Sequence, residues 1–324
     1  MIENKLLVIR GGAIGDFILT LPVLAALRRQ FPQTKIEVLG YEHIAQLAVA
    51  GGLADEVRSI EARALAGFFA RNGNLEQGLR EYFESFAIIL SYLYDPDGVF
   101  QENVARCSKA QFIVGPHRPD ETMGLHATAC FLGPLERLAI FDPDPVPRLA
   151  LSTPAGKPAI RNAGFPTGDS PHRAAPRECG TLLAAHPGSG SERKNWPEAR
   201  WSELLAEILR TTHANLLLVG GEAERGRVER LAGALTGERL HLAASLRLAE
   251  LAQRLTGCAA FIGHDSGISH LAASLGVPSL LLWGETNEAV WRPLGQGIEI
   301  LRAGTALAGL PVAPVLEKLR PLLS

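Results

Sequence analysis

Cysteine is scarce in this sequence of 324 residues. Its four cysteines lie far apart and form no Cys-x-x-Cys pair; they are Cys107, Cys130, Cys179 and Cys258. This spacing argues against the disulfide framework of a small secreted fold and against the paired thiolates of a structural zinc site. We therefore expect reduced thiols, no disulfide and no structural zinc, as in a cytoplasmic protein.

Long apolar runs are lacking as well. The uncharged apolar stretches fall well short of the ~20 residues that cross a bilayer, and Arg10 and Asp16 interrupt the apolar start of the chain. That start is typical of a first β-strand rather than of a signal peptide. We expect a protein that does not cross a membrane, although work beside one stays open.

The chain also lacks an excess of charge of either sign, because 32 Lys and Arg face 34 Asp and Glu. A formal net charge of −2 gives no general attraction to nucleic acid or to an anionic membrane, so no nucleic-acid partner is expected. The charge is uneven: residues 1–150 hold 14 basic against 18 acidic side chains, residues 151–180 hold 4 against 2, and residues 181–324 hold 14 against 14. An anionic ligand must therefore meet a local site.

Short apolar runs alternate with helical patterns in both halves, which is typical of α/β proteins. In the first half this predicts a helix at 17–30 and strands at 5–10, 35–40, 86–92 and 111–114. The second half gives helices at 199–211 and 223–235 and strands at 181–186, 215–219, 259–262 and 278–282. Such apolar strands suit parallel sheets covered on both faces. We predict two Rossmann-like, doubly wound domains, 1–150 and 181–324.

Residues 151–180 have the composition of a linker, with five prolines and several Gly, Ser and Thr. Two doubly wound domains joined in this way would face a cleft at the carboxyl ends of their sheets, where such sheets bind ligands.

A glycine-rich loop follows the first predicted strand and ends at Gly15-Asp16. Glycines there let backbone amides approach a ligand, and a nicotinamide site is the obvious candidate. However, Arg10 stands where a Gly-x-Gly-x-x-Gly fingerprint needs glycine, and Glu37 lies inside the second strand rather than at its end. Asp16 has two interpretations, a helix N-cap or a catalytic carboxylate.

A second loop follows the first strand of the second half and reads His186-Pro187-Gly188-Ser189-Gly190-Ser191-Glu192-Arg193-Lys194. Small residues with exposed amides, serine hydroxyls and a lysine suit phosphate oxygens. The alternative is a polar loop that leads into a helix. Ser189 is not the nucleophile of a hydrolase elbow, because Pro187 and Ser191 stand where Gly-x-Ser-x-Gly needs glycine.

A third loop, Gly263-His264-Asp265-Ser266-Gly267, turns from a strand into a helix whose amides and dipole favour an anion. The Asp-Ser-Gly triplet also matches the aspartic-protease signature, but that all-β fold needs a second triplet. His264 and His270 are six residues apart, a spacing that argues against a metal pair on one helix face. Asp265 as a simple helix cap stays open.

Two Asp-Pro-Asp triplets, at 95–97 and 142–144, imitate the metal-binding signature of some sugar transferases. A proline between two aspartates indicates a turn first, so we predict no metal site there.

Six short patterns stand in a characteristic order and spacing: Gly15-Asp16 with Leu19-Thr20-Leu21-Pro22, His186-Pro187-Gly188, Lys194-Asn195-Trp196-Pro197, Gly221-Glu222, Gly263–Gly267 with Ser269–Ala272, and Trp283–Thr286. Their conjunction resembles the bacterial lipopolysaccharide heptosyltransferases, glycosyltransferase family 9. The resemblance implies the two-domain GT-B fold and transfer of heptose from ADP-heptose to the inner core of lipopolysaccharide, with inversion and without metal or cofactor.

The resemblance also implies roles for individual residues. Asp16 would be the general base and Lys194 a catalytic cation beside the diphosphate. Glu222 would accept the ribose hydroxyls. The donor-binding set is Ser189, Gly190, Lys194, Glu222, Asp265, Ser266, Gly267 and His270.

The acceptor site is left unassigned, because no spacing selects among the basic side chains of the first half, Arg58, Arg63, Arg71, Arg106, Lys109, His117 and Arg118. We expect a cytoplasmic monomer, with peripheral contact at the inner membrane open. Three alternatives stay open: a nucleotide-sugar-binding protein without transferase activity, a transferase for another nucleotide sugar, and a nicotinamide-dependent oxidoreductase.

Overall fold

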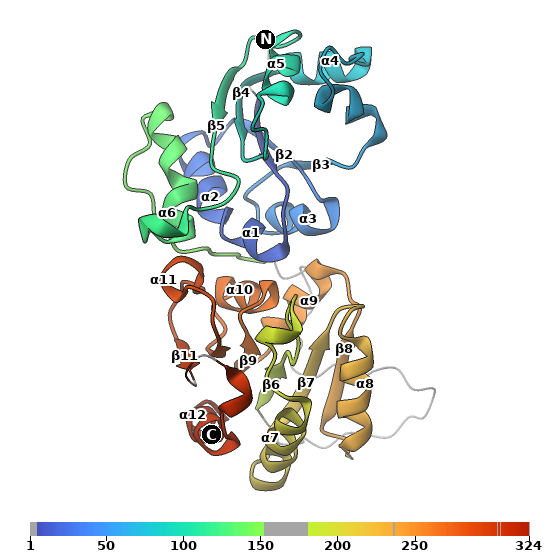
Figure 1. Ribbon diagram of the computed structural model, residues 1–324, viewed down its shortest axis with the longest axis vertical. Helices are drawn as coiled ribbons and strands as arrows, with labels where there is room; N and C mark the ends of the chain where they lie inside the picture. Colours follow the sequence, from blue (N-terminus) through green and yellow to red (C-terminus); the bar gives the residue numbers. More distant parts are fainter. Residues whose placement is uncertain (1–4, 152–180, 236, 303, 305, 324) are drawn as a thin grey trace. The chain divides into compact units, whose positions relative to one another are not determined.

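A computed structural model describes residues 5–151, 181–235, 237–302, 304 and 306–323. These residues form two compact units, each built around one parallel sheet (Figure 1). The first unit comprises the described part of Met1–Leu151 together with Asn287–Leu294, and the second comprises the described part of Ser152–Thr286 together with Gly295–Ser324. The predicted fold class of two doubly wound α/β domains is confirmed.

The sheet of the first unit has five strands in the order β3-β2-β1-β4-β5, all parallel. The strands are β1 (Lys5–Arg10), β2 (Lys35–Gly40), β3 (Glu56–Ser59), β4 (Phe86–Ser91) and β5 (Gln111–Val114). The central strand β1 is apolar almost throughout because both of its faces are covered.

Helices cover both faces of this sheet (Figure 1). They are α1 (Ile14–Ile18), α2 (Leu21–Gln30), α3 (Glu42–Ala50), α4 (Gln77–Glu84), α5 (Val99–Ala105) and α6 (Ala127–Leu132), with 3-10 turns η1 (Arg63–Phe69), η2 (Glu121–Met123) and η3 (Gly133–Leu138). On one face Leu7 and Ile9 of β1 share a core with Phe68, Phe83 and Phe100. Because side chains alternate along a strand, Leu6 and Val8 are buried on the opposite face.

The first unit also includes a late piece of the chain, Asn287–Leu294, which contains α11 (Glu288–Trp291). The indole Nε1 of Trp291 donates to Glu121 at 2.9 Å, and His126 Nε2 lies 2.8 Å from the carbonyl oxygen of Arg292. The sequence predicts the second domain as one uninterrupted stretch, 181–324. The structure differs, because these contacts hold residues 287–294 in the first unit.

The sheet of the second unit has six parallel strands in the order β11-β10-β9-β6-β7-β8. They are β6 (Leu182–Ala185), β7 (Asn215–Gly220), β8 (Leu240–Ala244), β9 (Ala260–His264), β10 (Ser279–Trp283) and β11 (Ile298–Arg302). The helical elements are α7 (Glu198–Thr211), α8 (Arg225–Ala234), α9 (Leu248–Leu255), α10 (Gly267–Ser274) and α12 (Val312–Leu323), with η4 (Glu192–Lys194) and η5 (Leu307–Gly309). Side chains of α7, α8 and α12 pack with Trp196 and the apolar strands in one core.

Two predicted elements differ from the observed ones. The helix predicted at 17–30 is two helices, because the chain turns at Leu19 and Thr20 and Pro22 occupies the first turn of α2, where proline is tolerated. The edge strands β3, β8 and β11 were not predicted. The predicted linker, 151–180, lies outside the described residues except for Leu151.

Each sheet has one point at which its strand order reverses, and ligands of such sheets bind beyond the carboxyl ends of the strands at that point. In the first unit the reversal lies between β1 and β4, and in the second between β6 and β9. The loops after β1, β6 and β9 are the three loops that the sequence singled out. Within the described residues, no helix combines the length and apolar character that crossing a membrane requires.

Candidate active site

Asp16 lies in the short helix α1, directly after the loop that follows β1. Its Oδ2 accepts the backbone N–H of Ala13 at 3.0 Å, so the carboxylate is held by its own loop. Gly12 makes this geometry possible, because its φ is +94° and a Cβ there would lie 2.9 Å from Asp16 Oδ2. The Asp16 side chain remains 29% exposed and can meet a substrate.

Arg10, the last residue of β1, contacts Asp16. The sequence pattern indicates of this position only that the glycine of a dinucleotide fingerprint is missing. The Arg10 side chain is buried; Nη2 lies 3.3 Å from the Asp16 carbonyl oxygen, to which it donates, and 3.6 Å from Asp16 Oδ1. Nη1 donates to the carbonyl of His117, and the guanidinium lies 4.5 Å from the Phe131 ring centroid. Burial lowers the pKa of Arg10, while Asp16 opposes that shift.

The loops after β4 and β5 bring aromatic and basic side chains to the same edge of the first sheet. Tyr94 is 70% exposed, and its ring centroid lies 4.6 Å from that of His117. Arg118 lies over Trp291 and forms an ion pair with Glu121 at 3.5 Å. Of the basic residues left unassigned by the sequence, His117 and Arg118 therefore lie beyond the carboxyl ends of the strands in the unit that carries Asp16.

In the second unit, the loop after β6 carries Ser189, Gly190 and Lys194. Ser189 is buried and its Oγ donates to the carbonyl of Ser191 at 2.8 Å, which closes a tight turn. Gly190 is exposed, and a Cβ there would contact no atom within 4 Å. Lys194 reaches across to the third loop, with Nζ 2.6 Å from Asp265 Oδ2.

The third loop starts helix α10 at Gly267, with Ser266 as its N-cap. The Ser266 hydroxyl accepts the N–H of Ser269, so Ser266, and not Asp265, caps the helix. The first amides of a helix have no partner within it and form a positive end that favours an anion. The cationic Nζ of Lys194 is held beside this helix start by Asp265. His270 lies inside α10 with its side chain buried.

Glu222 and Glu224 differ sharply in their surroundings. Glu222 is exposed on the turn after β7. Glu224 instead turns its carboxylate back toward the strand ends: Oε2 accepts the N–H of Gly221 at 3.0 Å, and a Cβ on Gly188 would lie 2.2 Å from Glu224 Cγ. The acid that the structure brings to the loop after β6 is therefore Glu224.

Two buried histidines lie beneath the loops after β6 and β9. Burial lowers the pKa of His186 to about 4 and that of His264 to about 3. Ser266 Oγ lies 3.4 Å from His186 Nδ1, which links the two loops. In the sequence, only the position of each histidine at the end of a strand indicates this role.

In each Asp-Pro-Asp triplet, one aspartate accepts hydrogen bonds from nearby backbone amides. Asp95 accepts the N–H groups of Phe100 and Gln101 at the start of α5, and Asp144 accepts the N–H of Val146. Among the described residues, no three His, Cys, Asp or Glu side chains gather in a group that could hold a metal ion.

The structure thus brings six predicted donor residues together at the β6–β9 reversal: Ser189, Gly190, Lys194, Asp265, Ser266 and Gly267. Asp16 belongs to the first unit.

Comparisons with known proteins show which family and which fold this chain resembles. The family described as "Glycosyltransferase family 9 (heptosyltransferase)" has a sequence model that matches residues 142–309. Lipopolysaccharide heptosyltransferase 1 of Pseudomonas aeruginosa is 38% identical over 125 residues, which are 39% of this chain and 33% of that protein. Lipopolysaccharide heptosyltransferase 3 of Escherichia coli is 23% identical over 297 residues, 86% of this chain and 83% of that protein.

The fold is also shared with a solved structure, that of the Escherichia coli ADP-heptose lps heptosyltransferase II. The two share 18% sequence identity with a TM-score of 0.75, over 98% of each chain.

Proposed function

This chain belongs to glycosyltransferase family 9, and we propose that it transfers heptose from ADP-heptose to the inner core of lipopolysaccharide. The proposed reaction is a single displacement with inversion at the anomeric carbon. It needs no metal, because the protein supplies the positive charge that the departing diphosphate requires.

The observation that carries the proposal is the position of Lys194 at the start of α10. A nucleoside diphosphate that leaves a sugar carries growing negative charge on its outer phosphate. Lys194 Nζ lies 2.6 Å from Asp265, and Asp265 directly precedes Ser266, the N-cap of this helix. A lysine and a helix dipole together are an anion site, and the hydroxyl-rich turn at Ser189 adds polar groups to it.

Glu224 supports recognition of the nucleoside. A carboxylate beyond the end of β7 can accept both hydroxyls of a ribose, and the glycines at 188 and 221 leave space around it. We therefore assign the ribose contact to Glu224 in place of Glu222, whose exposed side chain points to no such role.

Asp16 is the proposed general base. The acceptor hydroxyl oxygen forms a bond to the anomeric carbon while the bond from that carbon to the diphosphate oxygen breaks. The hydroxyl proton passes to the Asp16 carboxylate, and ADP leaves with the electron pair of the broken bond. Arg10 and the Ala13 amide keep the carboxylate oriented.

Transfer can be tested with purified protein, ADP-heptose and a deacylated inner-core acceptor. We expect ADP release in the presence of EDTA and a product whose anomeric configuration is inverted. Asp16→Asn keeps the shape of the side chain and should lower kcat by 10²–10⁴-fold, with unchanged ADP affinity. Full activity of Asp16→Asn would remove Asp16 as the base, and loss of activity in EDTA would remove the metal-independent mechanism.

The donor assignment has its own matched pair of variants. Glu224→Gln should weaken adenosine and ADP binding by about tenfold, as expected for a lost charge-assisted hydrogen bond. Glu222→Gln should leave both affinities within twofold. The reverse result would return the ribose contact to Glu222.

One observation favours a second candidate, a nucleotide-sugar-binding protein without transferase activity. Arg58 and Arg118 in the first unit already have acidic partners, Glu37 at 3.8 Å and Glu121 at 3.5 Å, which weakens the case for an anionic acceptor there. A thermal-shift panel of nucleotide sugars separates donors, since a ligand at 100 times its Kd adds ~2.7 kcal/mol of stability. Donor binding without turnover on any core acceptor would favour this candidate.

A further inference from the structure

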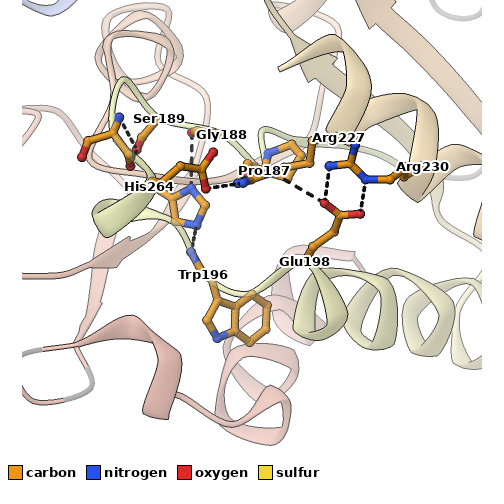
Figure 2. A network of polar contacts seen from close by, with 10 residues as sticks. Pro187, Gly188, Ser189, Trp196, Glu198, Arg227, Arg230 and His264 are labelled. Atoms are coloured by element: carbon orange, nitrogen blue, oxygen red, sulfur yellow. Dashed lines mark hydrogen bonds and ion pairs between the residues drawn. The ribbon is translucent and has the colours of Figure 1, made fainter. Parts of the chain in front are cut away.

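The loop of residues 187–196, here called the phosphate loop, is held from two sides by side chains that do not belong to it (Figure 2). His264 ends strand β9 on one side, and Arg227 extends from helix α8 on the other. His264 contacts the loop near both of its ends, and Arg227 contacts it at its beginning and at its middle.

His264 joins the two ends of the loop through one imidazole ring. Its Nε2 accepts the N–H of Trp196 at 2.9 Å, so the ring proton is on Nδ1, which faces the carbonyl oxygen of Gly188 at 3.3 Å. The residue is fully buried and its ring stands edge-on to that of Trp201, with centroids 5.4 Å apart. Burial also lowers the pKa of His264 to about 3, which keeps the ring neutral and the acceptor nitrogen available.

Arg227 fixes the same loop from the opposite side. Its guanidinium donates to the carbonyl of Pro187 at 2.9 Å and to Glu192 Oε2 at 2.5 Å. Its side chain is only 14% exposed, so the charge is largely withdrawn from water. A buried charge is costly unless it is paired and hydrogen-bonded. Arg227 meets that condition mainly through the phosphate loop, because its bonds to Pro187 and Glu192 are shorter than its 3.9 Å contact with Glu198.

The neighbouring arginine on α8 has no such contact with the loop. Arg230 binds Glu198 through two hydrogen bonds of 2.8 Å, and Glu198 begins helix α7 beyond the loop. Arg227 and Arg230 are both cationic residues of helix α8. Both also contact Glu198, because Arg227 Nε lies 3.9 Å from its carboxylate. They differ in the bonds to Pro187 and Glu192.

We propose that Arg227 and His264 are positioning residues that hold the phosphate loop in the shape that receives the diphosphate of the donor. This inference rests on the proposed function of the loop. An irregular loop that orders only on binding loses conformational entropy at that moment, which weakens affinity. Arg227 belongs to helix α8 and His264 to strand β9, so their bonds to the loop remove most of that entropy loss. The same bonds hold Ser189 and Lys194 in place before the donor binds.

The proposal predicts a selective loss of diphosphate binding, measured by isothermal titration calorimetry with ADP and adenosine as probes. Arg227→Met should weaken ADP at least tenfold and leave adenosine within twofold, because adenosine has no phosphate for the loop to meet. Arg227→Lys retains one donor and a charge and should recover part of the ADP affinity. Arg230→Met is the matched control and should leave both affinities unchanged.

His264 supplies an independent pair of variants. Asn places an amide near the Nδ1 position and Gln places one near Nε2, so each keeps one of the two bonds to the loop. His264→Asn and His264→Gln should each weaken ADP and spare adenosine, with circular dichroism like that of the wild type.

Each outcome decides a separate question. Equal ADP affinity in the wild type and Arg227→Met would overturn the inference, as would parallel losses of ADP and adenosine. A wild-type protein that binds no ADP would overturn the proposed donor site and this inference together. Selective loss of ADP in a protein that transfers no heptose would support the inference and overturn the proposed activity.

Discussion

Gly12 shows how one residue can hold a neighbouring carboxylate in place. Its φ of +94° is strained for any residue with a Cβ, and a Cβ there would press on Asp16 Oδ2 at 2.9 Å. We expect Gly12→Ala to cost about 1–2 kcal/mol of stability and, by displacing the carboxylate, to lower kcat at least tenfold. Urea denaturation and initial rates measure the two effects.

Gly52 is the matched control for Gly12. It lies in the same unit with a φ of +68°, and a Cβ there would contact no atom within 4 Å. Gly52→Ala should therefore show a similar loss of stability with no change in kcat. If both variants keep the wild-type rate, the Gly12 contact has no part in orienting Asp16.

The buried histidines make stability depend on pH. His186 and His264 have pKa values of about 4 and about 3 when folded, lowered by burial from an ordinary value of 6.5. Above pH 6.5 both are neutral in either state, so their contribution is complete. As the pH falls from 6.5 toward 4, these histidines bind protons in the unfolded chain but not in the folded protein. The free energy of unfolding therefore decreases by ~1.4 kcal/mol per pH unit for each histidine.

His264→Gln isolates one of these two contributions. The free energy of unfolding of the second unit, measured by urea denaturation at pH 7.5, 6 and 5, should fall less steeply in the variant than in the wild type. The expected difference between pH 6 and pH 5 is ~1.4 kcal/mol. Parallel curves would show that His264 is protonated in the folded protein within this range.

At the residue scale, sequence reasoning located loops better than individual side chains. The positions of Ser189, Lys194 and Ser266 followed from short motifs at strand ends, and the structure brings them together. The choice between Glu222 and Glu224 depends on a turn in which Glu224 bonds back to the amide of Gly221. No spacing encodes that turn, so motif reasoning selected Glu222, and the choice between the two carboxylates stays a prediction that the matched variants decide.

Helix α5 illustrates capping by a side chain that imitates a metal ligand. The two carboxylate oxygens of Asp95 accept the N–H groups of Phe100 and Gln101. We expect Asp95→Ala to cost about 1 kcal/mol of stability, as for other lost helix caps, and to leave the proposed heptose transfer unchanged. Thermal unfolding and ADP release check the two parts.

The second aspartate of that triplet, Asp97, provides the control. It is exposed and lies 3.7 Å from Arg71, so its removal should change stability by less than ~1 kcal/mol. Strong loss of transfer in Asp95→Ala or Asp97→Ala, with the fold intact, would return the triplet to consideration as a metal site.

Among whole elements, the central strands were predictable and most edge strands were not. The strands β1 and β2 begin and end at the predicted residues because nearly all their positions are buried and most of their residues are apolar, although Glu37 lies inside β2. The edge strand β3 has half-exposed and exposed positions only, and β8 and β11 are also largely accessible. An edge strand with few buried positions does not need a run of apolar residues. The hydrophobic pattern alone therefore cannot reveal such a strand.

For the whole molecule, the segment 287–294 decides which pieces of chain are stable alone. Residues 1–151 without it lose the Trp291 bond to Glu121 and the Arg292 carbonyl at His126. We expect a fragment 1–151 joined by a Gly-Ser linker to 287–294 to be more stable than 1–151 by about 1–2 kcal/mol. Urea denaturation of the two fragments measures the difference.

A linked fragment with Trp291→Ala tests whether the segment itself is responsible. It should lose most of the added stability while retaining the same chain length. Equal stability of all three fragments would show that residues 287–294 add nothing to the first unit.

Because residues 287–294 belong to the first unit, hybrids between relatives need more than one junction. The chain moves between the units near residue 151, again after Thr286 and a third time after Leu294. A single splice in the region after residue 151 would therefore join one parent's first unit to the other parent's α11. An intact exchange of second units requires three junctions, so that Trp291 keeps the Glu121 and Arg118 of its own parent.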